Sequence, residues 1–275
     1  MKISTSTSVL VNYLLEDAID KVISLGFEGV DVWCGRPHLY RQDYLNPHIL
    51  ALKDKFIAKG LKAASVMPAF FRYPYSLCSP LTTIIDDSIR YMTDCIDNAK
   101  LIGAESVLVV PIKNLIGQTL EEARGIFMKN LFVICDYAES QNMRLDIEVI
   151  NPGLSDFLCE TKQAVQIIQE IGSDNLGIVL DTGHLNLSGE NAETAIETAG
   201  ELLKQVHIND NNGIDQQNAI PGKGNFDFAG FSRLLKKYGF TGCLSLELGW
   251  HYSFDPEPIL SAAIAATKEL MRPEE

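Results

Sequence analysis

Residues 144–181 hold the pattern that decides the fold of this chain. The run RLDIEV at 144–149 and the run LGIVLD at 176–181 have the length and apolar content of buried strands. The stretch 161–171 between them has the apolar spacing of a helix. A strand, a helix and a second strand in this order are typical of a parallel sheet.

The same unit recurs toward both ends of the sequence. The predicted strands are residues 3–4, 29–33, 62–66, 106–110, 144–149, 176–181, 205–209 and 243–248. Eight strands that alternate with helices predict a (β/α)8 TIM barrel, and an open doubly wound sheet is the competing architecture. No GxGxxG motif follows the first strand, which favours the barrel.

Local signals support the helices of this barrel. Thr119 and Glu122 have the spacing of an N-terminal capping box. Gly26, Gly103 and Gly239 end helical stretches just before predicted strands, as glycine does at helix C-termini. The predicted helices are 17–25, 49–57, 84–102, 119–141, 161–171, 192–203, 228–238 and 258–271. Because no linker rich in proline, glycine or serine interrupts the pattern, residues 1–275 are predicted to form one domain.

The composition argues against several classes of function. Lys and Arg number 23 and Asp and Glu number 36, so the net charge is −13, and the pI is about 4.8. Proteins that bind nucleic acid or anionic membranes carry the opposite charge balance. No apolar run is long enough for a membrane span, the first residues do not resemble an export signal, and the six cysteines form no close pair. We expect a cytoplasmic protein that binds neither nucleic acid nor membranes.

Four ionisable side chains stand at the ends of four consecutive predicted strands. They are Glu148, Asp181, His207 and Glu247. The strand ends of a (β/α)8 barrel meet at one face, where its chemistry takes place. Three carboxylates with one imidazole, and with no Lys or Arg close by in those strands, need another cation to offset the cost of burial. This set suits Mn²⁺, Mg²⁺, Co²⁺ or Zn²⁺, so we predict that the site binds one divalent ion, and we expect Mn²⁺ ahead of the other three.

The motifs around these residues resemble one family over nearly the whole chain. The sequence is similar to the sugar phosphate isomerase/epimerase family with the xylose isomerase-like TIM barrel. This resemblance rests on LDIE at 145–148, LDTGH at 180–184, VHIND at 206–210, IPGKG at 220–224 and LSLE at 244–247. A narrower similarity, to ketose 3-epimerases of the fructoselysine 3-epimerase type, rests on VWCGRPH at 32–38, YPY at 73–75 and EP at 257–258.

The resemblance implies a reaction and a role for individual residues. The four strand-end residues would hold the metal, Glu148 and Glu247 would also exchange a substrate proton, and His184 would hydrogen-bond a substrate oxygen. The implied enzyme is a carbohydrate epimerase or isomerase of the EC 5.1.3 type. It removes and returns a proton beside a ketose carbonyl through an enediolate that the metal stabilises. The implied substrate is a small ketose or ketosamine, such as fructoselysine, epimerised at C3.

Further side chains are candidates for substrate binding. Arg36 and His38 follow the second predicted strand, where an arginine could grip a carboxylate or phosphate or could pair with a surface acid. Asp210 closes the VHIND motif, and Trp250 follows Glu247. Aromatic residues after the second and third strands could form a wall for a sugar or could pack in the core: Trp33, Phe70, Phe71, Tyr73 and Tyr75.

The sequence departs from the repair endonucleases of the same family, which bind three zinc ions through additional histidines. The stretches ASVM at 64–67, VVPI at 109–112 and DQQ at 215–217 offer no such histidine. One metal and a sugar substrate are therefore expected. Two alternatives stay open, a metal-dependent lyase of the inosose dehydratase type and a barrel that binds sugar without catalysis. The resemblance also points to a homo-oligomer, either a dimer or a tetramer.

Overall fold

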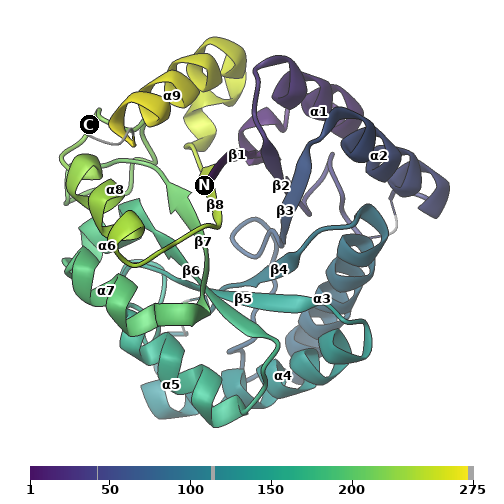
Figure 1. The fold of residues 1–275 in the computed structure, drawn as a ribbon. Helices are drawn as coiled ribbons and strands as arrows, with labels where there is room; N and C mark the ends of the chain where they lie inside the picture. Colours follow the sequence, from purple (N-terminus) through teal and green to yellow (C-terminus); the bar gives the residue numbers. More distant parts are fainter. Residues whose placement is uncertain (42, 113–114, 272–275) are drawn as a thin grey trace.

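The computed structural model describes residues 1–41, 43–112 and 115–271. In this part of the chain, eight parallel strands pair in sequence order and close into a barrel, because β1 pairs with both β2 and β8 (Figure 1). The strands are β1 (Lys2–Ser6), β2 (Gly29–Trp33), β3 (Lys62–Met67), β4 (Ser106–Val109), β5 (Arg144–Val149), β6 (Leu176–Asp181), β7 (Leu203–Ile208) and β8 (Cys243–Leu246). The predicted (β/α)8 barrel is confirmed, and the open sheet is excluded.

Helices connect the strands and surround the barrel (Figure 1). They are α1 (Leu15–Ser24), α2 (Asn46–Lys59), α3 (Thr82–Ile102), α4 (Leu120–Ser140), α5 (Thr161–Ile171), α6 (Thr182–Ser188), α7 (Ala192–Ala199), α8 (Phe228–Lys237) and α9 (Pro256–Leu270), with the 3-10 turns η1 (Thr7–Leu10), η2 (Gly200–Leu202) and η3 (Trp250–Phe254). Within the described residues, no helix is both long and apolar enough to cross a bilayer.

The predicted helix signals are present in the structure. The Thr119 side chain accepts a hydrogen bond from the Glu122 backbone N–H at 3.2 Å, and the Glu122 carboxylate accepts one from the Thr119 backbone N–H at 2.9 Å. This is the capping box at the start of α4. Gly26, Gly103 and Gly239 have φ of +79°, +81° and +70°, a conformation that glycine adopts without a Cβ clash.

One helix expectation was wrong, and one short helix was not predicted. The stretch 192–203 is not one helix, because α7 ends before Gly200, whose φ of +50° and ψ of −129° leave the helical region. The short helix α6 was not predicted. It starts directly after β6 and is capped by the Asp181 side chain, which accepts a hydrogen bond from the His184 backbone N–H. Seven residues are too few for apolar periodicity to reveal a helix.

The main apolar core lies between the barrel and the helices, and strand alternation decides which side chains join it. In β7, Val206 and Ile208 pack in this outer core. Gln205 and His207, on the other face, point into the barrel and contact residues of other strands. A small second cluster packs separately from the main core: Trp33, Met67, Ala69, Leu108 and Val179.

A polar layer centred on Asp31 of β2 fills the barrel below the strand ends. Asp31 is fully buried and accepts hydrogen bonds from Ser65 Oγ at 2.9 Å, from Gln205 Nε2 at 2.8 and 2.9 Å, and from Ser245 Oγ. Burial raises the pKa of the Asp31 carboxyl. These bonds link β2 to β3, β7 and β8 directly beneath the predicted site.

Candidate metal centre

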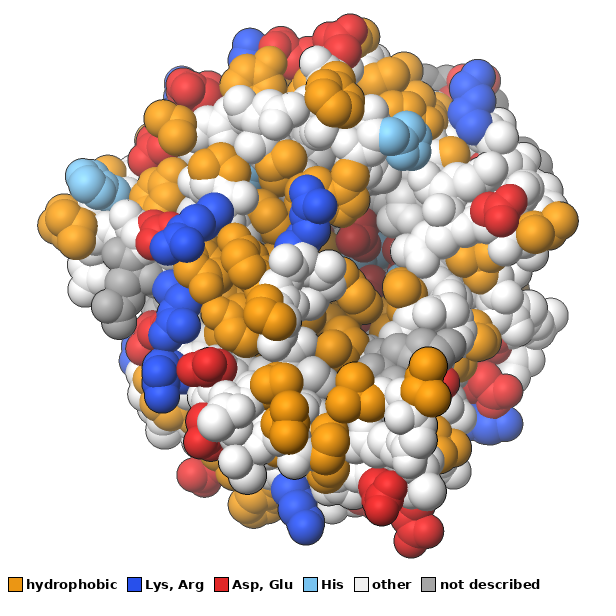
Figure 2. Space-filling model, turned by 180° about the vertical axis from the view of Figure 1, so that it is seen from behind, with side chains coloured by type: hydrophobic (Ala, Val, Ile, Leu, Met, Phe, Trp, Pro, Cys, Tyr) orange, Lys and Arg blue, Asp and Glu red, His pale blue; other side chains and the backbone are white. Residues whose placement is uncertain are grey.

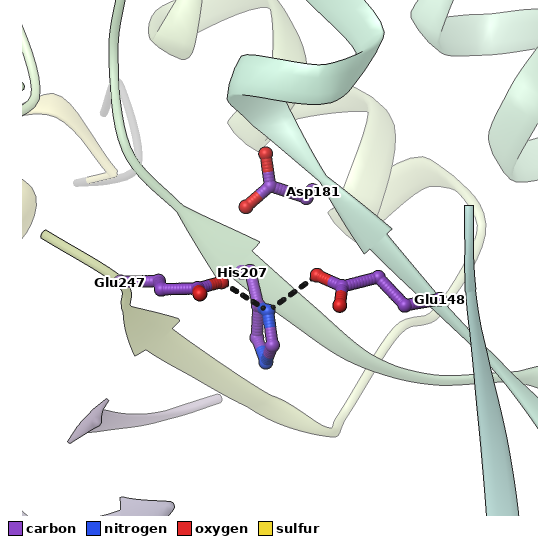
Figure 3. Close-up of side chains that lie close together, drawn as sticks. All are labelled: Glu148, Asp181, His207 and Glu247. Carbon is purple, nitrogen blue, oxygen red and sulfur yellow. Dashed lines mark hydrogen bonds and ion pairs between the residues drawn. The ribbon is translucent and has the colours of Figure 1, made fainter. Parts of the chain in front are cut away.

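The four side chains predicted at the strand ends meet at one point (Figure 3). Each offers a ligand atom, and these atoms all lie within 4.8 Å of one another. Asp181 of β6 pairs in register with His207 of β7. The structure corrects the ends of two strands at the site, since β7 ends at Ile208 and not at Asn209, and β8 ends at Leu246 and not at Leu248. Glu247 keeps its place because its backbone N–H donates to the Ile208 carbonyl at 3.2 Å.

His207 lies between two of the carboxylates. Its Nδ1 is 2.8 Å from Glu148 Oε1 and 2.9 Å from Glu247 Oε2 (Figure 3). Burial opposes the charged imidazolium, but Glu148 and Glu247 outweigh it and raise the pKa of His207 well above its ordinary value. Burial also opposes ionisation of Glu247, yet the hydrogen bond with His207 lowers its pKa. A divalent cation would take the place of the proton that these groups share.

Asp181 is held by neighbours within two of the strand-end motifs. Its Oδ2 accepts a hydrogen bond from Asn209 Nδ2 at 2.6 Å, and its Oδ1 accepts one from the His184 backbone N–H at 2.7 Å. Burial, together with the charges of the two glutamates, raises the pKa of Asp181 to about 6. Asn209 was not predicted as a site residue, although it lies two residues after His207 and so follows the strand's two-residue period.

The opposite edge of the His207 ring faces Asp31. Nε2 lies 3.7 Å from Asp31 Oδ2, which is too long for a hydrogen bond, and Nε2 is a buried atom with no hydrogen-bond partner. Histidines that bind metals usually donate their other ring N–H to a carboxylate or carbonyl, which fixes the tautomer. Asp31 is therefore the group placed to leave Nδ1 available to a metal. Asp31 was not predicted as a site residue, because an aspartate inside a predicted strand gives no sign of which strand it faces.

This donor set fits a divalent cation. In the described part of the chain, no Lys or Arg nitrogen lies within 4.0 Å of the Glu148, Asp181 or Glu247 carboxylates, and the ion pairs that Glu148 and Glu247 form are with His207. The three carboxylates would carry −3 around a neutral imidazole, and a dication would reduce this to −1. Oxygen and imidazole ligands suit several divalent metals, so the set predicts a metal without selecting one.

A cavity of about 310 Å³ leads to two of these carboxylates. Its lining is mostly apolar and consists of Ser8, Trp33, Met67, Pro68, Ala69, Phe71, Arg72, Leu108, Val110, Glu148, Glu247 and Trp250. Figure 2 shows the hollow, with hydrophobic side chains around it and acidic atoms at its base. The volume lies at the lower end of the range of about 300–1,000 Å³ that is typical of small-molecule sites.

The predicted aromatic wall is only partly present. Trp33, Phe71 and Trp250 line the cavity, and the two indole rings meet edge to face with their centroids 5.0 Å apart. The other predicted aromatic residues pack with Tyr40 and Tyr91, which is the core alternative: Phe70, Tyr73 and Tyr75.

His184 and Asp210 do not line this cavity, although both lie near the metal ligands. His184 Nδ1 is 3.0 Å from Asn151 Nδ2, and its backbone N–H donates to the Asp181 carboxylate that caps α6. Asp210 accepts hydrogen bonds from the backbone N–H groups of Gly222 at 2.9 Å and Gly224 at 2.7 Å. Asp210 therefore shapes the loop at 220–224.

Arg36 and His38 also lie outside the cavity lining. Two nitrogens of Arg36 donate to the Asp43 carboxylate at 2.5 and 2.9 Å, which is the surface ion pair weighed as the alternative. His38 is buried between Thr7 Oγ1 and the Tyr13 carbonyl, at 3.1 and 3.2 Å. Burial lowers the pKa of His38 to about 4, so the ring is neutral at pH 7. Partners within the protein account for both side chains without a substrate.

The chain is similar to one family of known proteins in both sequence and structure. The family model described as xylose isomerase-like TIM barrel matches residues 19–270. The fructoselysine 3-epimerase of Shigella flexneri is 23% identical over 261 residues, which cover 95% of each chain. The structure of D-psicose 3-epimerase from Clostridium cellulolyticum H10 with D-tagatose superposes with a TM-score of 0.83 at 17% identity and covers 99% of this chain and 100% of the other. The IOLI protein with a zinc atom gives 0.82 at 21% identity, covering 98% of both chains.

The structural matches establish the fold, and the family model spans most of the sequence. The chain's relatives include a fructoselysine 3-epimerase and a D-psicose 3-epimerase, which confirms the prediction of an enzyme of this class. The resemblance inferred from the strand-end motifs is likewise confirmed. The chain belongs to the xylose isomerase-like TIM barrel family.

Proposed function

We propose that the protein is a divalent-metal-dependent epimerase that moves the proton on the carbon next to a ketose carbonyl. The proposed position is C3 of a ketose or of a ketosamine such as fructoselysine. The observation that carries this proposal is the placement of Glu148 and Glu247. Both border one cavity, and their carboxylates approach the His207 ring from two sides (Figure 3). The named 3-epimerases among the relatives support the choice of reaction.

The two glutamates would divide the proton transfer between them. A proton beside a carbonyl is too weakly acidic for a carboxylate alone, and a divalent cation bound by the four strand-end residues would supply Lewis-acid polarisation of the carbonyl. One glutamate then accepts the proton, and the other, protonated, donates to the opposite face of the carbon. Two carboxylates are needed because return of the proton from the first would restore the starting sugar.

The apolar cavity wall would orient the sugar between these carboxylates. Trp33, Leu108 and Trp250 offer flat or branched apolar surface to the carbon skeleton and keep water from the base of the cavity. We assign Trp250 to substrate binding. We assign Asp210 and His184 to supporting positions beside the metal-ligating residues, where they hold the loop at 220–224 and the start of α6 in place.

We propose one metal ion per chain, with Mn²⁺ as the native ion. The three carboxylates and one imidazole support a single site, and elemental analysis of the purified protein tests both number and identity. Three ions per chain would contradict the assignment. The cytoplasmic location and the dimeric or tetrameric state stay predictions from the sequence.

The function is tested by incubating the Mn²⁺-loaded protein with ketoses, ketosamines and their phosphates in deuterated water. Proton NMR should show one substrate losing its C3–H signal while its epimer accumulates. The epimer should have the mass of the substrate, apart from the deuterium it has gained. Loss of water from the product would instead support a lyase. Binding of sugars without any exchange of C–H for deuterium would support a barrel that is not catalytic.

A further inference from the structure

The charges around the cavity are unevenly distributed. Glu148 and Glu247 are the acidic lining residues, and Glu148 is 5% exposed, so this end is deep. Arg72 is the one basic residue in the lining, among the described residues, and it is exposed at the surface. Figure 2 shows a basic side chain beside the hollow and acidic atoms at its base. A small molecule that reaches the carboxylates therefore passes a cation at the opening.

Arg72 is held in an ordered position there. Its guanidinium carbon lies 3.8 Å from the centroid of the Trp250 ring, and its backbone N–H donates to the Ala69 carbonyl at 3.0 Å. A guanidinium stacked on an aromatic ring uses its face for that contact, and its N–H groups lie in its plane, directed away from the ring. The stack thus fixes the side chain without using its hydrogen-bond donors.

Arg36 shows within the same molecule what a stacked guanidinium binds. Its guanidinium carbon lies 4.6 Å from the Tyr40 ring centroid, and its in-plane nitrogens donate to the two oxygens of Asp43. Arg72 has the same kind of stack. Among the described residues, however, no carboxylate lies within 4.0 Å of its nitrogens. The two arginines therefore differ in their partners: Arg36 is paired with a carboxylate of the protein, and Arg72 is paired with no carboxylate of the described residues.

We propose that Arg72 binds an anionic group of the substrate, so that the substrate class is a ketose carrying a phosphate or a carboxylate at the end remote from its carbonyl. This inference rests on the proposed function for the position of the carbonyl. With a net charge of −13 on the chain and a net −1 at the loaded metal cluster, the rest of the protein does not attract an anion. Planar, bidentate pairing with carboxylate or phosphate is the chemistry that distinguishes arginine from lysine.

Binding can be measured independently of turnover. The chain has two tryptophans, Trp33 and Trp250, and both line the cavity, so intrinsic fluorescence reports ligand binding there. The probes are D-fructose, D-fructose 6-phosphate and D-fructuronate, titrated into the Mn²⁺-loaded and the metal-free protein. The proteins compared are the wild type, Arg72→Gln, Arg72→Lys and the matched control Arg36→Gln, which removes the other stacked arginine.

We expect the wild type to bind at least one anionic ketose about 10- to 100-fold more tightly than fructose, as is typical of hydrogen bonds to a charged group. Arg72→Gln should remove this preference and leave fructose binding within about threefold, Arg72→Lys should keep part of it, and Arg36→Gln should keep all of it. Preference for phosphate or for carboxylate identifies which anion the site takes. If exchange at C3 occurs, the loss in Arg72→Gln should fall on KM for the anionic substrate and not on kcat.

Equal dissociation constants for the three sugars in the wild type would overturn the proposal. An equal loss of affinity for all three sugars in Arg72→Gln would also overturn it, because Arg72 would then only support the Trp250 ring. Failure of the proposed function gives a different result. In that case no sugar exchanges its C3 proton, while the fluorescence titration still decides whether Arg72 selects anions.

Discussion

The two halves of the barrel differ in what their strand ends present to the cavity. The β5–β8 half carries the ionisable cluster, and every member of it contacts another member or a fixed hydrogen-bond partner. The β1–β4 half carries mostly apolar surface, from Trp33 at the end of β2 through Met67 of β3 to Leu108 of β4. In the proposed reaction, the β5–β8 half supplies the groups for proton transfer, and the β1–β4 half supplies the surface that holds the substrate.

This difference suggests that reaction and specificity can be altered separately. Changes in the β5–β8 half should affect metal binding and the chemical step for every substrate. Changes in the β1–β4 half, where Arg72 also lies, should affect which substrate binds. Trp250 joins the two halves, because it follows β8 in sequence and packs against Trp33 of β2.

The largest effect is expected for loss of the metal ligands. At about 100 times its dissociation constant, Mn²⁺ should stabilise the wild type by about 2.7 kcal/mol, which raises Tm by about 5–10 °C. His207→Gln should lose this shift and any C3 exchange, whereas the exposed His48→Gln serves as the matched control and should keep both. A full Mn²⁺ shift in His207→Gln would show that the cluster is not the metal site.

A smaller effect on metal binding is expected for a change at Asp31, which lies beneath the metal-ligand cluster. Asp31→Asn should weaken Mn²⁺ affinity about 10- to 100-fold, because the carboxylate that selects the His207 tautomer is lost. Nitrogen NMR of the ring with a diamagnetic metal should show a change in the tautomer population, and Asp31→Glu should restore part of the affinity. Asp146→Asn, another buried aspartate that pairs with Arg144, controls for general damage to the interior. Equal affinity in the wild type and Asp31→Asn would remove Asp31 from the account.

The pH dependence should follow the raised pKa values of Asp181 and His207. Metal-free folded protein holds protons that the unfolded chain has released, so these groups make it less stable as pH rises through their raised pKa values. Metal binding needs both groups deprotonated, so the Tm gain from Mn²⁺ should grow from pH 5 to pH 8. Affinity should change about tenfold per pH unit for each proton released. A gain that does not vary with pH would contradict the assigned ligands.

The smallest effect is expected for a change at Trp250, which is assigned to substrate binding. Trp250→Leu should raise KM about three- to tenfold, since one aromatic contact is lost, with kcat and Mn²⁺ affinity unchanged. Steady-state kinetics with whichever ketose, ketosamine or phosphate proves to be the substrate will show whether KM changes while kcat does not. A fall in metal affinity would show that the two halves are not separable.

The sequence predicts the β5–β8 half well and the β1–β4 half poorly, for physical reasons. Glu148, Asp181 and His207 interrupt apolar strands, and barrel topology brings strand ends together wherever the strands lie. The partner of Arg36 depends on how one loop folds back, and the burial of His38 depends on contacts with Thr7 and Tyr13. Neither contact follows from strand order.

Two further residues were missed for related reasons. Asp31 lies inside a strand, and its importance comes from facing His207, which is 176 residues later in the chain. Arg72 lies in a turn after β3, and its importance comes from the Trp250 ring that follows β8. Contacts across the barrel are decided by strand tilt and side-chain packing, which a single sequence does not specify.

The central claim is that Glu148 and Glu247 exchange the proton next to the ketose carbonyl. The most direct measurement is deuterium incorporation at C3 by Mn²⁺-loaded wild type, Glu148→Gln and Glu247→Gln, with the surface variant Glu201→Gln as control. We predict incorporation in the wild type and the control, and a loss of about 10²- to 10⁴-fold in each of the other two. Full incorporation in both Glu148→Gln and Glu247→Gln would contradict the account.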